Sequence, residues 1–194
     1  EFVLASFDKE LKVYTPSELN IPPKNIEENG SLTENAIAKV MAYEETELDI
    51  PIIAYDTGLF IQNRNIDPVK VKRNALEGKK ESELSQEEIA ELMIDYYKKI
   101  AKDNGGEIDA YFLDVFAIKL PGQHVKTFEV KRMLKIVDKQ YKALDIYFPI
   151  NSIYKVANTN KYYAELSDEE KLAWLRGYQI GLRDHLGLKL TCFT

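Results

Sequence analysis

The chain has 194 residues, of which 45% are hydrophobic and 30% are charged. These values are ordinary for a globular protein and argue against a disordered chain, so we expect a single domain over residues 1–194. The formal net charge of −6 gives the molecule no overall positive field, and we therefore expect no nucleic-acid partner.

The absence of long apolar runs and the scarcity of cysteine and histidine bear on the cellular location and on the kind of metal that the protein would bind. No apolar run approaches the roughly 20 residues that a membrane helix needs, and the start "EFVLASFDKEL" does not resemble a signal peptide. The single cysteine, Cys192, and the two histidines argue against a disulfide framework and against a structural zinc site. We therefore expect a cytoplasmic protein without a membrane partner, in which any metal would be a hard cation such as Mg²⁺ held by carboxylates.

The predicted elements alternate between helices and strands, as in an α/β protein. A serine followed three residues later by a glutamate forms a capping box, and this spacing places helix starts at Ser31, Ser85 and Ser167. Glycines at 105–106 and at 187 are expected to end the second and third helices. The first expected helix begins at Ser31 and ends near "EETELD", residues 44–49, and the other two cover 85–106 and 166–187. The expected strands cover 11–15, 50–56, two arms of a hairpin over 108–137 that turns at 121–124, and 144–150. Residues 62–84 lack a sustained period.

The strand predicted over residues 50–56 ends on a carboxylate, Asp56, which is followed by Thr57 and Gly58. An ionised carboxylate beside an apolar run must be paired, hydrogen-bonded or bound to a metal. In one interpretation Asp56 caps a turn through the amides of Thr57 and Gly58. In the other, Asp56 and the acidic pair at residues 27–28 share one hard cation, as in magnesium sites that serve phosphate substrates. The pattern alone leaves both interpretations open.

Three cations are placed where they would contact phosphate or a base, and each also has an ordinary structural explanation. Lys39 lies beside the apolar stripe of the first helix, where a lysine usually extends to solvent. Lys161 lies in the loop "NTNKYYAEL", where an exposed lysine is common. Arg176 lies in the last helix and would pair with the acidic first turn of that helix.

Two stretches of the sequence resemble a known family, the inosine-triphosphate pyrophosphatases. "ENAIAKVMAYEETELDIPIIAYDTGL", residues 34–59, is similar to the family's E-N-A-x-x-K-A, helix, short strand and D-S/T-G-L. "KYYAELSDEEK", residues 161–171, is similar to its K-T-x-A-E-L/M-x-x-E-E-K. The two stretches occur in the family's order with a long hairpin between them, and together they are more specific than either is alone.

The resemblance implies an α/β fold with an elongated mixed β-sheet and flanking helices in two lobes, and a homodimer. It implies an Mg²⁺-dependent hydrolase that converts a nucleoside triphosphate to the monophosphate and pyrophosphate, acting on deaminated purine nucleotides such as ITP, dITP or XTP. Asp56 would be a metal ligand and the base that orients water. Glu27 would be the second metal ligand, with Glu28 as the alternative because the loop before Ser31 is ambiguous by one residue.

The resemblance also implies which side chains contact the nucleotide. Two lysines and one threonine lie within the two matching stretches and would contact the nucleotide directly. One aspartate and one arginine lie near the positions of the family's base-binding motifs. These residues are Lys39, Thr57, Asp145, Lys161 and Arg176.

The sequence departs from the family pattern at three places. The family's opening strand and T-x-N-x-x-K loop are absent, and because "EFVLASF" resembles the segment that comes after this loop in the family, we expect an N-terminal truncation. The base-binding F-G-Y/W-D-P corresponds to "KALDIYFP", which keeps only Asp145, and S-H-R is replaced by "WLRGY". Tyr55 stands where many relatives have a second acid. Two alternatives therefore stay open: a non-catalytic relative that binds a nucleotide or a protein partner, and an unrelated α/β fold in which Asp56 caps a turn.

Overall fold

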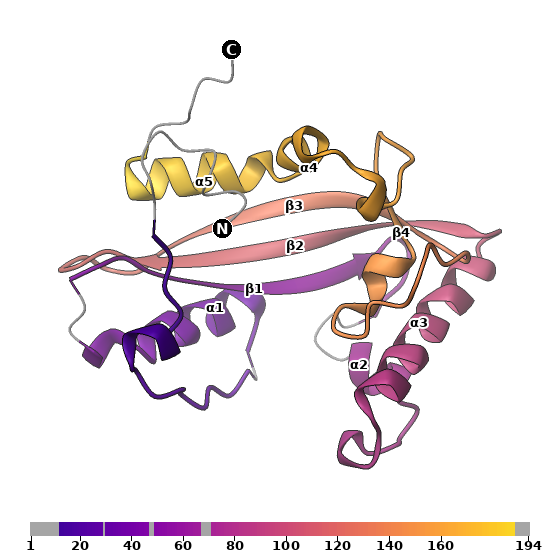
Figure 1. Cartoon of the computed structure of the whole chain (residues 1–194), viewed down its shortest axis with the longest axis horizontal. Helices are drawn as coiled ribbons and strands as arrows, with labels where there is room; N and C mark the ends of the chain where they lie inside the picture. Colours follow the sequence, from indigo (N-terminus) through magenta and orange to yellow (C-terminus); the bar gives the residue numbers. More distant parts are fainter. Residues whose placement is uncertain (1–11, 29, 47–48, 67–70, 189–194) are drawn as a thin grey trace. The chain divides into compact units, whose positions relative to one another are not determined.

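The computed structural model describes residues 12–28, 30–46, 49–66 and 71–188 (Figure 1). No helix within these residues is long and apolar enough to cross a membrane. The chain divides into two compact units. Three of the four boundaries between them fall within strands β1 (Ile52–Ile61), β2 (Glu107–Lys119) and β3 (Lys126–Val137), and the fourth falls between Trp174 and Leu175. Unit 1 comprises Glu1–Thr57, Leu113–Lys131 and Leu175–Thr194; unit 2 comprises Gly58–Phe112 and Arg132–Trp174.

The described residues form a four-stranded sheet flanked by helices, which confirms the predicted α/β class. The strands lie in the order β1-β2-β3-β4, and β3 and β4 are antiparallel, with Leu134 opposite Val156 and Ile136 opposite Tyr154. The strands are β1 (Ile52–Ile61), β2 (Glu107–Lys119), β3 (Lys126–Val137) and β4 (Tyr154–Val156). The helices are α1 (Leu32–Met41), α2 (Val71–Ala75), α3 (Gln86–Lys102), α4 (Asp168–Trp174) and α5 (Arg176–Leu186).

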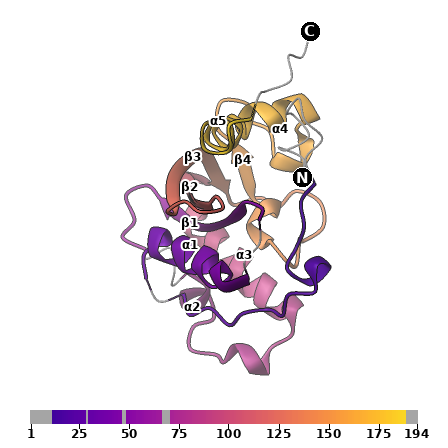
Figure 2. The same cartoon turned by 90° about the vertical axis from the view of Figure 1, so that its left-hand side faces the viewer.

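In unit 1, helices α1 and α5 lie on opposite sides of the strands (Figures 1 and 2). Helix α5 approaches the sheet closely because two of its inward positions are glycines. A Cβ atom at Gly177 would lie 2.5 Å from Val130 Cγ1, and a Cβ atom at Gly181 would lie 2.0 Å from Phe128 Cε2. The Phe128 ring is stacked between the rings of Phe116 and His185, at 4.8 and 4.9 Å between centroids, so it has little room to move aside.

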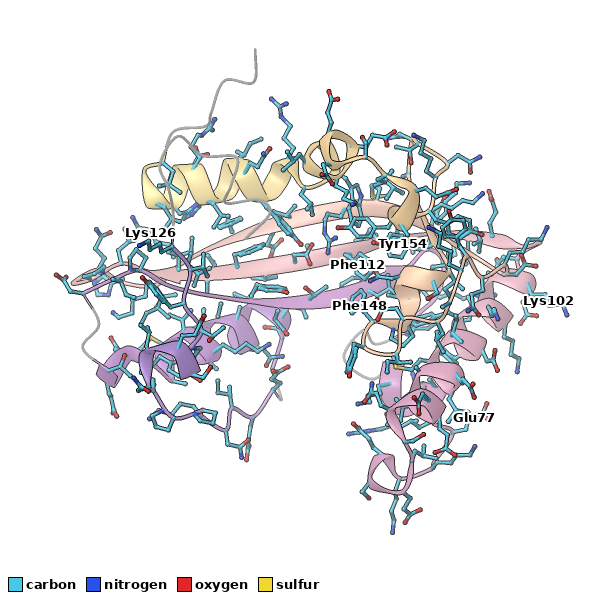
Figure 3. All side chains as sticks on the ribbon, in the orientation of Figure 1. Glu77, Lys102, Phe112, Lys126, Phe148 and Tyr154 are labelled. Atoms are coloured by element: carbon cyan, nitrogen blue, oxygen red, sulfur yellow. The ribbon has the colours of Figure 1, made fainter. Side chains whose placement is uncertain are left out.

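In unit 2, helix α3 packs on the strands and buries a large hydrophobic cluster. Ile94, Tyr97 and Ala101 supply the helix side of this cluster. Phe112 and Tyr154 lie on the strand side of the cluster, and the exposed ring of Phe148 lies 6.1 Å from that of Phe112 (Figure 3). The Arg132 guanidinium lies 4.8 Å from the Phe112 ring centre and 4.5 Å from that of Trp174, an arrangement that places a cation against two aromatic faces.

The predicted helix starts and the predicted hairpin are confirmed. The capping boxes at Ser31, Ser85 and Ser167 all form, each with the side chain of the glutamate three residues later bonded back to the serine amide. Gly187 adopts a left-handed conformation (φ 66°) directly after α5, as expected of a helix-ending glycine. Strands β2 and β3 are the two arms expected over residues 108–137.

The first strand does not end at Asp56, as the sequence predicted, but continues to Ile61. Beyond Gly58 the chain keeps an apolar pattern, with Leu59 and Ile61 buried. The amide of Gln62 still donates to the carbonyl of Asp109 on β2 at 2.9 Å. Because these contacts hold the backbone extended, Thr57 and Gly58 lie within the strand and not in a turn.

Four further elements also differ from the prediction. Helix α1 ends at Met41 and a short 3₁₀ turn follows at Glu44–Thr46, because acidic residues are unfavourable at the negative end of a helix. The described part of residues 11–15 forms no strand, and α2 lies in the segment that lacked periodicity. The last helix is divided at Leu175, whose φ of −93° and ψ of 11° separate α4 from α5.

The strand predicted over residues 144–150 is a loop followed by a 3₁₀ turn at Pro149–Ser152. The Asp145 carboxylate accepts hydrogen bonds from the amides of Tyr147 (3.1 Å) and Phe148 (2.9 Å) and from Asn151 Nδ2 (3.0 Å). Burial raises the pKa of Asp145, but these bonds outweigh it and lower the pKa overall. A carboxylate that binds its own neighbouring amides offers the backbone an alternative to strand pairing.

Replacing Gly181 with alanine tests the close packing of α5. In a helix this change normally stabilises a protein by about 0.5–1 kcal/mol, but here the added methyl group would overlap the enclosed Phe128 ring. We expect Gly181→Ala to lower the free energy of unfolding by about 1–3 kcal/mol, measured by urea denaturation. The control Ile180→Ala, at an exposed position of the same helix, should change it by about 0.5 kcal/mol or less. A more stable Gly181→Ala protein would contradict the packing described.

Candidate functional site

Asp56 lies at the centre of a hydrogen-bonded cluster in unit 1. Its side chain on β1 is 12% exposed. Oδ2 accepts a hydrogen bond from Asn35 Nδ2 at 3.0 Å, and Oδ1 accepts one from Lys39 Nζ at 2.8 Å. Asn35 and Lys39 are four residues apart on α1, so they lie on the same face of that helix. One helix face therefore holds both oxygens of the carboxylate.

The interpretation of Asp56 as a turn cap is wrong. Thr57 and Gly58 form part of β1, and the carboxylate is bonded to side chains more than fifteen residues earlier in the sequence. Its position in mid-strand explains the difference, because backbone groups of an extended chain point across the sheet and not towards a side chain of the same strand. Asp56 thus needs partners from another element.

Lys39 connects Asp56 to a second carboxylate. Its Nζ atom lies 3.0 Å from Glu28 Oε1 and 2.8 Å from Asp56 Oδ1, and its side chain is 22% exposed. Partial burial lowers the pKa of Lys39, but the hydrogen bonds and charges of Asp56 and Glu28 outweigh it, so that the pKa is raised overall. Lys39 is therefore a fixed cation between two acids and not a lysine extended to solvent.

Asn35 is a site residue that the sequence reasoning did not identify. It is only 2% exposed, and its Oδ1 accepts a hydrogen bond from the Gly30 amide at 3.1 Å. A Cβ atom at Gly30 would lie 2.8 Å from Glu34, so glycine permits this close approach. Asn35 thereby links Asp56 to the loop that carries the acidic pair. A polar residue within the apolar stripe, four positions before Lys39, was the available signal.

Of the two glutamates before α1, Glu28 is the one that shares Lys39 with Asp56. Glu27 is exposed and makes a contact of its own. This arrangement favours Glu28 over Glu27 as the second carboxylate of the cluster.

Thr57, the next residue on β1, is directed to a different acid. Its hydroxyl donates to Asp114 Oδ1 at 2.7 Å, and Asp114 on β2 is fully buried. A buried carboxylate requires hydrogen-bond donors, so Thr57 has a structural role here. A contact between Thr57 and a nucleotide stays a prediction.

The other predicted site residues lie outside this cluster. Asp145 and Lys161 belong to unit 2, whereas Arg176 is exposed at the first position of α5 in unit 1. Lys161 Nζ pairs with Glu170 Oε1 at 2.6 Å. This bond, together with the Ser167 amide of the capping box, lowers the pKa of Glu170. The roles predicted for these three residues stay predictions.

An apolar cavity of about 340 Å³ adjoins Lys39 in unit 1. Its walls come from the segment before α1, from α1 itself and from the start of β1. The lining residues are Tyr14, Pro16, Leu19, Ile21, Ile26, Lys39, Tyr43 and residues 50–54.

The donor set of the cluster fits a hard divalent cation. Two carboxylates already face a single positive charge, the ammonium of Lys39. No group of three or more acidic, histidine or cysteine side chains suited to a metal occurs among the residues that the structure describes. Mg²⁺ does not need such a group, because it commonly takes one or two carboxylates and completes its shell with water and substrate phosphates.

Comparison with known proteins places this chain in one family. The Ham1 family pattern matches residues 2–176. A Ham1 protein from Staphylococcus aureus is 27% identical, with a TM-score of 0.59 over 87% of this chain and 85% of that chain. A comparison with curated proteins found no match.

Two further solved structures share the fold. A HAM1 protein from Coxiella burnetii is 24% identical, with a TM-score of 0.65 over 94% of this chain and 90% of that chain. A nucleoside-triphosphatase and dITP/XTP pyrophosphatase from Mycobacterium abscessus is 19% identical, with a TM-score of 0.58 over 88% of this chain and 84% of that chain. The chain belongs to the Ham1 family, which confirms the resemblance to inosine-triphosphate pyrophosphatases.

Replacing Asn35 with aspartate tests the bond that anchors Asp56. The new side chain keeps an acceptor for the Gly30 amide but replaces the donor to Asp56 with a second carboxylate about 3 Å away. Two such acids cannot both ionise without strong repulsion. We expect Asn35→Asp to lose stability at pH 7 and to recover part of it as the pH falls to 5, because one acid of the pair then binds a proton.

The matched control is Asn35→Ala, which removes both bonds without adding charge. It should lose about 1–3 kcal/mol, and this loss should depend on pH much less than that of Asn35→Asp. Urea denaturation at both pH values measures the two variants, and an equal pH response in both would contradict the arrangement.

Proposed function

We propose that the protein is a Mg²⁺-dependent hydrolase that converts a nucleoside triphosphate to the monophosphate and pyrophosphate. Its proposed substrates are deaminated purine nucleotides such as ITP, dITP or XTP. The observation that carries the proposal is the cluster in which Glu28, Lys39 and Asp56 meet, since these residues lie on or beside the motif shared with the family. Membership of the Ham1 family supports a hydrolase of this kind.

Asp56 is the proposed metal ligand and the base that orients the attacking water. Its side chain is largely buried and is held on both oxygens, so its position is fixed before a substrate arrives, and such preorganisation favours catalysis. Glu28 is the proposed second ligand, with Glu27 as the alternative. Magnesium bound by these acids would neutralise the triphosphate charge and polarise a phosphoryl oxygen.

The remaining predicted residues are proposed to hold the nucleotide. Lys39 and Lys161 would contact phosphate oxygens as point charges, and Thr57 would offer its hydroxyl. Asp145 and Arg176 would contact the base, as their positions near the family's base-binding motifs suggest. We further propose that residues 1–194 act as one nucleotide pyrophosphatase-like domain, as a cytoplasmic homodimer, because the resemblance implies this organisation.

The second candidate is a non-catalytic relative that binds a nucleotide or a protein partner. It is favoured by one observation, the loss of the family's F-G-Y/W-D-P and S-H-R motifs. This candidate predicts nucleotide binding without turnover and indifference of the protein to Asp56→Asn.

Pyrophosphate release from a panel of nucleotides tests the proposal. We expect release from ITP, dITP or XTP with Mg²⁺ and much less from ATP or GTP. Asp56→Asn should lower kcat by at least about a hundredfold, because the base and a metal ligand are lost together. Asp95→Asn, the same change at an exposed carboxylate on α3, is the control and should leave kcat unchanged.

The outcomes separate the candidates. Release from ordinary nucleotides, abolished in Asp56→Asn, would keep the chemistry and overturn the substrate class. Binding of the nucleotide without release would support the non-catalytic relative. Release that persists in Asp56→Asn would contradict the proposed site.

A further inference from the structure

We propose that Lys39 is a placeholder cation: its ammonium holds Glu28 and Asp56 together in the metal-free protein and leaves both when the metal binds. The displaced ammonium then becomes available to a substrate phosphate. This inference rests on the proposed function, in which the same two carboxylates bind the metal, and it adds an exchange between a lysine and that metal.

The first support is the geometry of the three charges. The two carboxylate oxygens on Lys39 Nζ, at 3.0 and 2.8 Å, lie within about 6 Å of each other, where two anions repel unless a cation lies between them. Lys39 is that cation in the described structure. A metal that takes both oxygens competes with the ammonium for them, and the repulsion between the two positive charges favours withdrawal of the lysine.

The second support is that Asp56 has two different bonds. Oδ2 is held by the neutral amide of Asn35, while Oδ1 is held by the charged Lys39. When Lys39 leaves, Asn35 still fixes the carboxylate. The exchange thus needs only a rearrangement of the long, flexible lysine side chain, and neither β1 nor α1 has to move.

The third support is access from solvent. The Glu28 side chain is 48% exposed and that of Lys39 is 22% exposed, so a hydrated cation reaches the outer acid first. Asp56, at 12% exposed, is reached only as the lysine withdraws. Exposure therefore decreases from Glu28 through Lys39 to Asp56. A cation would enter such a site from the Glu28 side.

The exchange has a consequence for binding. Metal affinity in the absence of nucleotide is reduced, because part of the binding free energy is used to displace Lys39. A triphosphate offers the displaced ammonium a new partner, so nucleotide and metal strengthen each other's binding, and this coupling is reciprocal.

A titration of nucleotide-free protein with Mg²⁺, followed by calorimetry, tests the inference. Lys39→Met removes the competing charge and keeps much of the side-chain volume, so we expect it to bind Mg²⁺ about tenfold or more tightly than the wild type. In the presence of a chelator, the Tm of Lys39→Met should be lower than that of the wild type. Mg²⁺ should raise the Tm of Lys39→Met by more than it raises the Tm of the wild type. Lys119→Met is the matched control, because Lys119 is similarly buried (18% exposed) and pairs with Glu44 at 2.9 Å in the same unit.

A second measurement uses the wild-type protein and so does not depend on a variant that folds. An amine-reactive ester modifies free lysines faster than lysines whose ammonium is held by acids. We expect Mg²⁺ to increase the rate of Lys39 modification, followed by peptide mass spectrometry, and to leave the rate at Lys119 unchanged. An unchanged rate at Lys39 at saturating Mg²⁺ would overturn the exchange.

The outcomes distinguish this inference from the proposed function. Equal Mg²⁺ affinity in the wild type and Lys39→Met, with binding lost in Asp56→Asn, would overturn the exchange and leave the metal site. Absence of Mg²⁺ binding in all three nucleotide-free proteins would overturn the exchange, because Lys39→Met is expected to bind Mg²⁺ tightly. Binding that persists in Asp56→Asn would overturn the metal site itself and the exchange with it.

Discussion

The bond between helix α1 and the Asp56 carboxylate is the constraint on which the candidate site depends. Asp56 lies in the middle of β1 with its side chain largely buried, and a buried anion must be compensated. Asn35 and Lys39 supply this compensation from consecutive turns of one helix. The capping box at Ser31 fixes where that helix begins, and therefore which side chains face the strand.

The same constraint connects the loop before α1 to the site. Gly30 donates to Asn35, and Glu28 pairs with Lys39, so the loop is held at two points by side chains that also hold Asp56. Two acids, one amide and one ammonium are thus connected by hydrogen bonds, and Lys39 Nζ also donates to the Tyr55 carbonyl at 3.4 Å. A set of this kind is stable without metal, and it presents two hard oxygen donors as soon as the ammonium leaves.

The sequence predicted those parts of the fold that depend on local chemistry. Capping boxes, the glycine at residue 187 and the long hairpin were all predicted correctly, because each depends on neighbouring residues. The end of β1 was not, since Leu59 and Ile61 continue the strand through burial in unit 2, which no short window reveals. The strand predicted at residues 144–150 failed because Asp145 bonds to its own following amides.

The sequence likewise predicted only some residues of the candidate site. Asp56 and Lys39 were named from a motif, but a motif does not show that they touch. Asn35 lies in the same motif and was missed, because sequence alone does not show which side chain donates to Asp56. Whether Glu27 or Glu28 faces Asp56 depends on the path of a loop, which sequence spacing leaves ambiguous by one residue. The contact with Lys39 favours Glu28.

A crystal structure with Mg²⁺ and a non-hydrolysable ITP analogue would test the central claim, that Glu28, Lys39 and Asp56 form a nucleotide-hydrolysing metal site. The account predicts a metal ion bound by Asp56 and Glu28, with the Lys39 ammonium moved to a phosphate oxygen. A metal held by other residues would contradict it, whereas a metal on both acids with Lys39 still bonded to them would overturn only the exchange.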